Sequence, residues 1–185
     1  TYSDKMSRCG LRIADIFNND FASKLRKLFE EYNRDSMHPI NIDESVAKYL
    51  TALELLKPFV KDTVYLLNKA IKSEKRIVLE GAQGTMLDID FGTYPYVTSS
   101  NTTVNGACTG TGIPPSKINK VVGVLKAYST RVGEGPMPTE LFCENGRKLQ
   151  TIGKEFDPCT GYRKHRCGWF DALVAKHTAI INGVN

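Results

Sequence analysis

The spacing of apolar residues changes at Arg76, and this change constrains the fold more than any other feature of the chain. Upstream of Arg76, apolar side chains recur at helical spacing over residues 21–32, 46–56 and 60–71. Such spacing places them on one face of a helix, where they can form a core. We therefore predict that residues 1–75 are mainly helical, with a kink or a restart at Pro58.

Downstream of Arg76, apolar residues come in short runs that are separated by polar loops. The runs at residues 77–79 and 121–128 have the length and composition of buried strands in a parallel sheet. Between them, residues 92–112 are rich in Thr, Ser, Asn and Gly. A polar span of this length is either functional or disordered, and the aromatic residues Tyr94 and Tyr96 favour an ordered loop.

Two further signals complete the expected fold. Asn145-Gly146 predicts a hairpin over residues 140–149. Residues 169–184 return to helical spacing, and Asn182-Gly183 is a typical helix stop. Strands that alternate with helices indicate the α/β class, with a central, mostly parallel sheet and flanking helices. The length of 185 residues is enough for one domain with a sizeable core.

The basic charge of the chain is concentrated in its second half. The chain carries 25 Lys and Arg against 20 Asp and Glu, a formal net charge of +5. Residues 91–133 contain no Asp or Glu, but they include Lys117, Lys120, Lys126 and Arg131. An acid-free basic span suits the binding of phosphate or carboxylate groups. On charge alone, however, a solvated basic face explains this span better.

Two loops carry groups that can recognise a nucleotide. Gln83 lies in the turn 80–84 after the first predicted strand, and its amide offers both a donor and an acceptor, as the lactam edge of a purine requires. The run from Thr98 to Thr102 offers hydroxyl groups and consecutive backbone N–H groups that can hold a phosphate. For the turn 80–84, the alternative is a tight turn whose glutamine is solvated. For the run from Thr98 to Thr102, the alternative is a polar surface loop.

A third loop, from Cys159 to Cys167, has two interpretations. Its arginines can bind a carboxylate through paired hydrogen bonds. Alternatively, Cys159, His165 and Cys167 could ligate zinc, but three ligands at this spacing match no usual zinc site, and we expect no metal in this chain. Motifs for a phosphate-binding loop or a catalytic nucleophile are not recognisable. The residues therefore indicate an α/β protein that binds a phosphorylated, carboxylated ligand.

Cysteine use and hydropathy favour a reducing, cytoplasmic environment. The five cysteines include no C-x-x-C pair, so a disulfide scaffold is not expected. No apolar run approaches the ~20 residues of a membrane helix, and the first ten residues lack the apolar core of a signal peptide. We expect the start at Thr1 to reflect either processing or a piece of a longer protein.

Long runs in these loops resemble the adenylosuccinate synthetase family. The resemblance is carried by residues 78–90 (VLEGAQGTMLDID) and 92–103 (GTYPYVTSSNTT). Shorter matching runs lie at residues 4–12, 125–133, 138–142 and 167–169. Runs of this length are highly specific, and the likeness extends over the whole chain.

The resemblance implies a complete reaction. The family joins IMP to L-aspartate with GTP and Mg²⁺. The lactam oxygen of IMP is phosphorylated and then displaced by the aspartate amine, which gives adenylosuccinate, GDP and phosphate on the route from IMP to AMP. Catalysis of this kind depends on positioning and on stabilising spread negative charge. The resemblance also implies a P-loop-NTPase-like architecture, a cytoplasmic enzyme and a homodimer.

Family roles transfer to five residues of this chain. Gln83 is similar to the glutamine that contacts the base of IMP, and Thr98 to the threonine that contacts its 5′-phosphate. Arg8 is similar to the arginine that reaches the same phosphate from the partner subunit. Val132 corresponds to a backbone contact with the ribose, and Arg163 to the arginine that serves IMP and the closure of the aspartate loop.

The aspartate loop implied by the resemblance runs from Cys159 to Arg166 and comprises Cys159, Thr160, Gly161, Tyr162, Arg163, Lys164, His165 and Arg166. It carries one residue more than the family pattern. The family's second loop arginine, which serves aspartate and GTP, therefore aligns with either His165 or Arg166. We predict His165 as the GTP-binding residue.

The resemblance covers only the middle of the family's sequence. The family's phosphate loop, general base and general acid precede the segment matched at residues 4–12, and its guanine-reading motif follows the end of this chain. We therefore expect no catalytic residue here, Mg²⁺ ligands outside this chain, and a central fragment that is inactive alone. The fragment would form part of a single domain, with residues 1–75 mainly helical and residues 76–185 carrying the IMP and aspartate loops.

Two other functions remain open at this point. The basic excess beside Tyr94, Tyr96, Tyr162 and Trp169 is also compatible with a nucleic-acid-binding module without catalysis, although the excess is modest and no RRM or KH signature occurs. A complete small protein that binds a phosphosugar or nucleotide is the other alternative. For an adenylosuccinate synthetase we expect neither a nucleic-acid partner nor a membrane partner.

Overall fold

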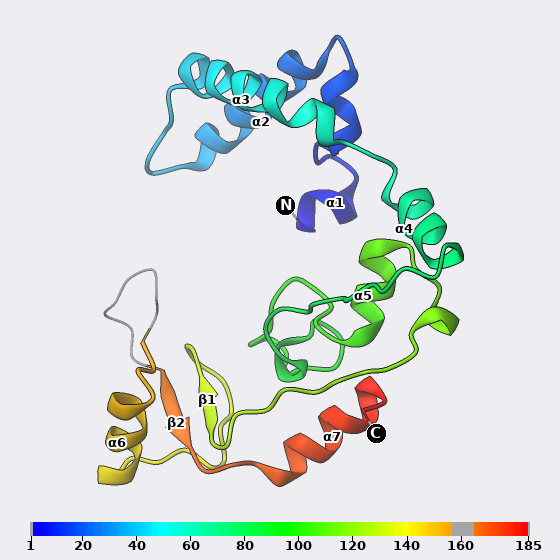
Figure 1. Ribbon diagram of the computed structural model, residues 1–185. Coiled ribbons are helices and arrows are strands. Elements are labelled where there is room, and N and C mark those ends of the chain that lie inside the picture. Colours follow the sequence, from blue (N-terminus) through cyan, green and yellow to red (C-terminus); the bar gives the residue numbers. More distant parts are fainter. Residues whose placement is uncertain (1, 157–164, 185) are drawn as a thin grey trace. The chain divides into compact units, whose positions relative to one another are not determined.

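The computed structural model of the chain describes residues 2–156 and 165–184. They form two compact units, which divide between Leu66 and Leu67 inside helix α4 (Thr63–Lys72) (Figure 1). The first unit is helical, and the second combines helices with a small sheet and long loops. The single domain expected from the resemblance stays a prediction.

The first unit contains α1 (Tyr2–Ser7), the 3₁₀ helix η1 (Ile13–Phe17), α2 (Phe21–Asp35), α3 (Ile42–Leu56), the 3₁₀ helix η2 (Lys57–Phe59) and the start of α4. The helices predicted from apolar spacing are confirmed. Pro58 lies in η2, after which the chain restarts as α4, so the restart is confirmed too. The Asn41 side chain caps α3 by accepting the Glu44 N–H at 3.2 Å.

A small apolar core holds α2 against α3. Its buried members are Ile16, Phe21, Leu25 and Val46. Leu25 is only 4% exposed. Beside this core, the rings of Phe29 and Tyr49 meet edge to face with their centroids 5.6 Å apart. The apolar face that the sequence predicts is therefore the face that these two helices bury.

The second unit contains η3 (Thr85–Leu87), α5 (Val104–Thr111), η4 (Pro115–Lys117), β1 (Ser129–Arg131), α6 (Glu144–Ile152), β2 (Arg166–Gly168) and α7 (Ala172–Asn182). Strands β1 and β2 pair antiparallel, with Thr130 opposite Cys167. A bridge between Glu140 and Gly168 continues the pairing. Helix α6 contacts β2 (Figure 1).

The two predicted strands are not observed in the described part of the chain. Residues 77–79 and 121–128 form no strand there. They are largely solvated instead, since Val78 is 88% exposed and Val124 is 93% exposed. A strand is defined by hydrogen bonds to a neighbouring strand, and neither run has such a neighbour among the described residues. The two-stranded sheet described here is antiparallel, so the mostly parallel sheet is not observed in these ranges.

The predicted hairpin over residues 140–149 is also wrong, because most of it belongs to α6. Asn145-Gly146 lies in the first turn of that helix. A Cβ on Gly146 would overlap the carbonyl oxygen of Leu141, so the glycine permits a close backbone approach rather than a hairpin turn. Glu144 and Lys148 form an ion pair of 2.9 Å one turn apart on the same helix.

The C-terminal helix α7 ends where the sequence predicts. Gly183 adopts a left-handed conformation with φ 63°, and its N–H donates back to the carbonyls of Ala179 and Ile180. The Asn182 side chain accepts the Val104 N–H and donates to the Thr85 hydroxyl, both at 2.9 Å. A single amide therefore joins α7 to η3 and α5.

Two further observations concern helix length and the cysteines. No helix in residues 2–156 or 165–184 is long and apolar enough to cross a membrane. The cysteines within these ranges, Cys9, Cys108, Cys143 and Cys167, are free thiols. Cys159 lies outside the described residues.

The core of the first unit generates a stability prediction. We expect Leu25→Ala to lower the free energy of unfolding of this unit by about 3 kcal/mol, because it removes buried methyl groups and leaves a cavity. Urea unfolding followed by far-UV circular dichroism measures the change. Leu55→Ala is the matched control, since Leu55 is 72% exposed and should lose less than about 0.5 kcal/mol. Equal losses in the two variants would show that this core does not stabilise the unit.

Candidate functional site

The centre of the site is the carboxylate of Asp88, which is fully buried. Its Oδ1 accepts the N–H groups of Asp90 at 2.9 Å and Phe91 at 3.2 Å, and its Oδ2 accepts those of Thr102 at 2.6 Å and Thr103 at 3.3 Å. Burial alone would raise the pKa of Asp88, but these four donors outweigh it and hold the pKa below its ordinary value. The ionised carboxylate therefore joins residues 90–91 to residues 102–103 at the other end of the polar loop.

The loop that Asp88 supports is further tightened by its own backbone. The Ile89 N–H donates to the Ser100 carbonyl at 3.1 Å, and the Gly92 N–H donates to the Asp88 carbonyl at 2.9 Å. A Cβ on Gly92 would overlap the carbonyl oxygens of Met86 and Asp88. Residues 86–103 are consequently an ordered loop, as the aromatic residues within it suggested.

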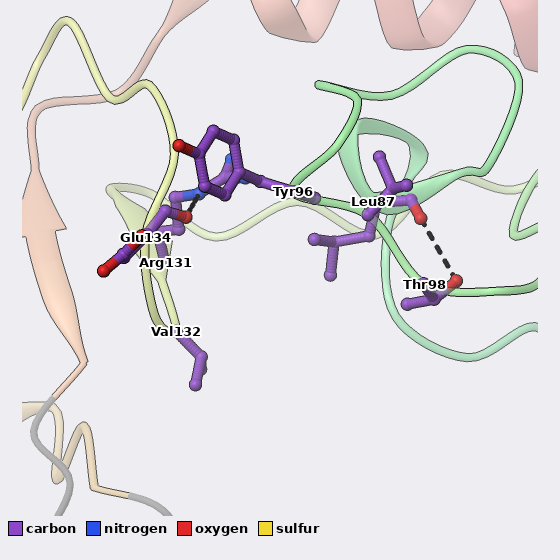
Figure 2. A pocket seen from close by; sticks show the side chains of 7 residues that line it. Leu87, Tyr96, Thr98, Arg131, Val132 and Glu134 are labelled. Carbon is purple, nitrogen blue, oxygen red and sulfur yellow. Dashed lines mark hydrogen bonds between the residues drawn. The ribbon is translucent and has the colours of Figure 1, made fainter.

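Thr98 and Gln83, two predicted IMP residues, are connected through Ser100. The Thr98 Oγ1 lies 2.8 Å from the Ser100 Oγ, and the Ser100 Oγ donates to the Gln83 Oε1 at 3.4 Å. The Thr98 hydroxyl also reaches the Leu87 carbonyl at 3.1 Å (Figure 2). The structure thus brings both residues into one hydrogen-bonded cluster.

The backbone of this run is not the row of free donors that we predicted. The N–H groups of Thr98, Ser100 and Thr102 donate to the Leu87 carbonyl, the Thr98 hydroxyl and Asp88, respectively. These bonds fold the loop, so its backbone cannot also present consecutive N–H groups to an anion. The Thr98 hydroxyl can still donate to a ligand by rotating away from Leu87 while it accepts the Ser100 backbone N–H.

Gln83 has an unusual backbone. Among the described residues, the non-glycine residues with positive φ are Arg8, Glu74, Gln83 and Lys154. All of them except Gln83 lie just after the end of a helix, where a left-handed residue commonly terminates the helix. Gln83, with φ 67°, has no such explanation. Conformations of this kind concentrate at functional sites, and the side chain of Gln83 is exposed.

A cavity of about 220 Å³ brings Thr98 together with Val132. Figure 2 shows Leu87 and Thr98 on one side of it and Val132, from the segment after β1, on the other. Tyr96, Val97, Arg131 and Glu134 complete the lining. Two residues predicted to bind one nucleotide, which are far apart in sequence, therefore line one pocket.

Arg131 connects the two sides of this pocket. Its Nη2 donates to the Thr93 hydroxyl at 2.8 Å. The Nη2 also donates to the Tyr96 carbonyl at 2.9 Å, and the Nε donates to the Glu134 carbonyl at 2.7 Å (Figure 2). Burial, and then the neighbouring Arg166 guanidinium, lower the pKa of Arg131. These partners are neutral oxygens, so they do not neutralise the positive charge of Arg131, which lines the pocket together with Glu134.

Arg166, one of the two candidates for the second loop arginine, binds a carboxylate of this chain. Its Nε lies 2.8 and 2.9 Å from the two Glu140 oxygens, its Nη2 donates to the same carboxylate, and its Nη1 donates to the Gly135 carbonyl at 2.7 Å. The hydrogen bond to Arg166 lowers the pKa of Glu140. This pair fastens β2 to the segment that follows Val132.

His165, the other candidate, also contacts a carboxylate. Its Nδ1 lies 3.0 Å from the Glu155 Oε2, and its backbone N–H donates to the Glu155 carbonyl at 3.0 Å. Burial would raise the pKa of Glu155, but Lys126, Tyr128 and His165 outweigh it and lower the pKa to about 2. The hydrogen bond from Tyr128 to Glu155 in turn raises the pKa of Tyr128 to about 12.

The remaining predicted residues lie elsewhere. Arg8 belongs to the first unit, whereas Gln83, Thr98, Val132, His165 and Arg166 belong to the second. Residues Cys159, Thr160, Gly161, Tyr162, Arg163 and Lys164 lie outside the described residues. Within the described ranges, no three His, Cys, Asp or Glu side chains gather as a metal site.

Sequence reasoning missed three residues that organise the site. Asp88 and Glu155 are acidic and almost fully buried, and a single sequence carries no signal for this because acidic residues are usually exposed. Arg131 did carry a signal, as the last basic residue of the acid-free span 91–133. Its position beside the predicted ribose contact could have identified it as a pocket residue.

Comparison with known proteins gives one consistent family. The profile of the family described as adenylosuccinate synthetase matches residues 1–185. The adenylosuccinate synthetases of Brachyspira hyodysenteriae and Saccharomyces cerevisiae are 51% and 50% identical to this chain over alignments of 193 and 190 positions. These alignments cover 100% and 99% of this chain and 44% of each relative. The chain therefore spans less than half the length of these relatives.

Comparison with solved structures indicates the same family. A fully ligated adenylosuccinate synthetase from Plasmodium falciparum superposes on this chain with a TM-score of 0.91 at 38% sequence identity. The match covers 99% of this chain and 43% of that protein. The α/β class predicted from the sequence is confirmed by this match.

The buried carboxylate of Asp88 generates a prediction with a pH signature. We expect Asp88→Asn to lower the free energy of unfolding by about 2 kcal/mol at neutral pH, because the new NH₂ group faces backbone donors. Since the folded pKa of Asp88 is lowered, its contribution is present above pH ~4 and is lost as the pH falls through the folded value. The difference between wild type and variant should therefore shrink in acid.

Urea unfolding followed by the fluorescence of Trp169, the single tryptophan, measures this difference. Glu80→Gln is the control, because Glu80 is an exposed carboxyl in the same unit. A loss of stability in Asp88→Asn that does not depend on pH would contradict the assigned role.

Proposed function

Because the chain belongs to the adenylosuccinate synthetase family, we propose that its 185 residues are the central part of a longer enzyme that joins IMP to L-aspartate at the expense of GTP. The product would be adenylosuccinate, in the formation of AMP from IMP. The chain covers 44% of its curated relatives, so the activity is proposed for the longer protein, and the fragment itself would be inactive.

The observation that carries this proposal is the pocket between Thr98 and Val132. Its size and lining suit the sugar phosphate of a nucleotide, with a hydroxyl donor at Thr98, the charge of Arg131 nearby and a backbone contact at Val132. The Ser100 bridge ties Thr98 to Gln83, whose amide matches the lactam edge of hypoxanthine. The left-handed backbone of Gln83 supports its assignment to the base.

These residues would bind and orient IMP for two successive steps. GTP would phosphorylate the lactam oxygen of IMP, which converts a poor leaving group into a good one. The aspartate amine would then attack the same carbon and expel phosphate. The general base, the general acid and the Mg²⁺ that balances the phosphoryl charge would come from the rest of the protein. This chain would contribute positioning and electrostatic attraction.

The loop from Cys159 to Arg166 would bind aspartate, with Arg163 shared between IMP and the loop. We assign GTP contact to His165 and keep Arg166 as the alternative position of the second loop arginine. Both residues carry an acidic neighbour in the described structure, Glu155 and Glu140, respectively. Such neighbours can orient a side chain toward a ligand.

We further propose that residues 77–79 and 121–128 pair as strands when the rest of the protein is present. Their apolar side chains are exposed in this chain, up to 93% at Val124, and their burial in a central, mostly parallel sheet would remove that surface from water. The complete protein would then have the P-loop-NTPase-like architecture of its family within a single domain.

The partners follow from the same proposal. A homodimer would let Arg8 reach the IMP phosphate of the partner subunit, and the enzyme would be cytoplasmic. The nucleic-acid-binding alternative is not favoured, because the family match accounts for the basic loops without it. We propose neither a nucleic-acid partner nor a membrane partner.

The first test is activity of the longer protein with IMP, aspartate, GTP and Mg²⁺. We expect adenylosuccinate to form and Arg8→Ala to raise the KM for IMP at least ~10-fold, since a charged hydrogen bond to phosphate is lost. Arg34→Ala is the control, because Arg34 is an exposed arginine in the same unit. Absence of adenylosuccinate would reject the function, and an unchanged KM would reject the role of Arg8.

A second test addresses the shared site. We expect Arg8→Ala and Gln83→Ala proteins, each weakly active, to recover about a quarter of wild-type activity when mixed and re-equilibrated, because hybrid dimers contain one intact site. Titration of one variant into the other, assayed at subsaturating IMP, measures the recovery. If the two activities simply add without recovery, Arg8 and Gln83 of one subunit would belong to the same site.

A further inference from the structure

The hydroxyl groups of Thr98 and Ser100 have more hydrogen-bond acceptors within reach than protons to donate. The two hydroxyl oxygens lie 2.8 Å apart. The Thr98 hydroxyl also lies 3.1 Å from the Leu87 carbonyl oxygen and 3.2 Å from the Ser100 carbonyl oxygen. The Ser100 hydroxyl lies 3.4 Å from Gln83 Oε1. Because a hydroxyl group carries a single proton, each of them can donate fully to only one of these acceptors at a time.

Backbone N–H groups already serve the two carbonyl acceptors. The Leu87 carbonyl accepts the Thr98 N–H at 2.9 Å, and the Ser100 carbonyl accepts the Ile89 N–H at 3.1 Å. Thr98 Oγ1 itself accepts the Ser100 N–H at 3.2 Å, which keeps this hydroxyl beside Ser100. The proton of the Thr98 hydroxyl can therefore turn toward Ser100 or toward a ligand without leaving either carbonyl unpaired.

The Gln83 amide is bound to this pair of hydroxyls through Ser100. Gln83 Oε1 can only accept, so Ser100 is the donor in the bond of 3.4 Å and must then accept the proton of Thr98. The three side chains thus form a chain of donors that runs from Thr98 through Ser100 to Gln83. Its weaker bond is the one to Gln83, since it is longer than the 2.8 Å contact between the hydroxyls.

A phosphate group at Thr98 would reverse the bond between the two hydroxyls. A phosphate dianion only accepts, so Thr98 would have to donate its proton to the phosphate and could no longer donate to Ser100. Ser100 would then turn its own proton to Thr98 Oγ1, because this restores the shorter of its two hydrogen bonds. Gln83 Oε1 would lose the Ser100 proton and become free to accept from the base of the ligand.

We propose that Ser100 is a positioning residue that couples the phosphate end of the bound nucleotide to its base. Phosphate at Thr98 releases the Gln83 amide from Ser100, so the base contact reaches full strength only with a ligand that carries the phosphate. The site thereby favours the nucleoside monophosphate over the nucleoside by more than the phosphate contacts alone provide. The proposal rests on the proposed function, which assigns Thr98 to the phosphate and Gln83 to the base.

The test compares the contribution of the Gln83 amide to the binding of IMP and of inosine, which lacks the phosphate. Calorimetric titration of the longer protein gives the Kd of IMP, and competition with IMP gives that of inosine. Gln83→Met removes the amide and keeps the length of the side chain. We expect it to weaken the binding of IMP ~3- to 10-fold more than the binding of inosine. In a Ser100→Ala background, it should weaken both equally, within ~2-fold.

Two further variants and a control separate this coupling from a structural role of Ser100. Ser100→Thr restores a hydroxyl and should restore the difference between IMP and inosine. Thr98→Val removes the other hydroxyl and should abolish the same difference, which keeps the proposal testable if Ser100→Ala fails to fold. Ser116→Ala is the matched control, because Ser116 is an exposed serine of the same unit, and it should keep the wild-type difference.

The outcomes also distinguish this proposal from the proposed function. Equal effects of Gln83→Met on IMP and inosine in the otherwise unchanged protein would overturn the coupling. A difference that persists in the Ser100→Ala background would overturn it too. A longer protein that does not bind IMP would reject the proposed function, and the coupling with it. A protein that binds IMP but forms no adenylosuccinate would reject the reaction alone, because the coupling is decided by binding.

Discussion

The hydrogen bonds to the buried carboxylate of Asp88 are the constraint on which the loop that carries Thr98 depends. Residues 88–103 contain little regular structure until α5 begins, so their backbone groups lack the partners that a helix or sheet would provide. The Asp88 oxygens accept four backbone N–H groups from opposite ends of the loop. With these ends held, Thr98 and Ser100 meet, and Gln83 can join them. A charged acceptor stabilises this arrangement more than a neutral one would, because charge-assisted hydrogen bonds are stronger.

The second half of the site depends on two further carboxylates at the short β1–β2 sheet. Glu140 binds Arg166 on β2, and Glu155 binds Lys126 and Tyr128 in the segment before β1. The antiparallel pairing of Ser129–Arg131 with Arg166–Gly168 sets Arg131 beside the pocket. Glu140 and Glu155 therefore each hold a neighbouring segment at the β1–β2 sheet. The strands of this sheet are too short to fix the position of such a segment without a further contact. The basic excess of residues 91–133 is accordingly balanced in part by acids from outside that span.

Sequence reasoning succeeded where local signals decide the structure. Apolar spacing identified α2, α3 and α4, and Gly183 marked the end of α7, because helices depend on contacts between residues close in sequence. Residues 77–79 and 121–128 form no strand among the described residues, because a strand needs a partner that the run itself cannot specify. Sequence reasoning failed at Asn145-Gly146, where a glycine that allows Leu141 to approach was interpreted as a turn. The buried acids could not be predicted, since burial depends on the distant segments that supply their donors.

The sequence by itself determined the family and the helices, because long motif runs are specific and helical spacing is local, and it singled out the residues that we propose for IMP and aspartate. Only the tertiary structure decided how those residues cooperate. It joined Thr98 to Val132 across one pocket and to Gln83 through Ser100, and it placed His165 and Arg166 against Glu155 and Glu140. The physical reason is that hydrogen bonds and burial act across space. Residues that are tens of positions apart become neighbours only when buried carboxylates and paired strands bring their backbones together.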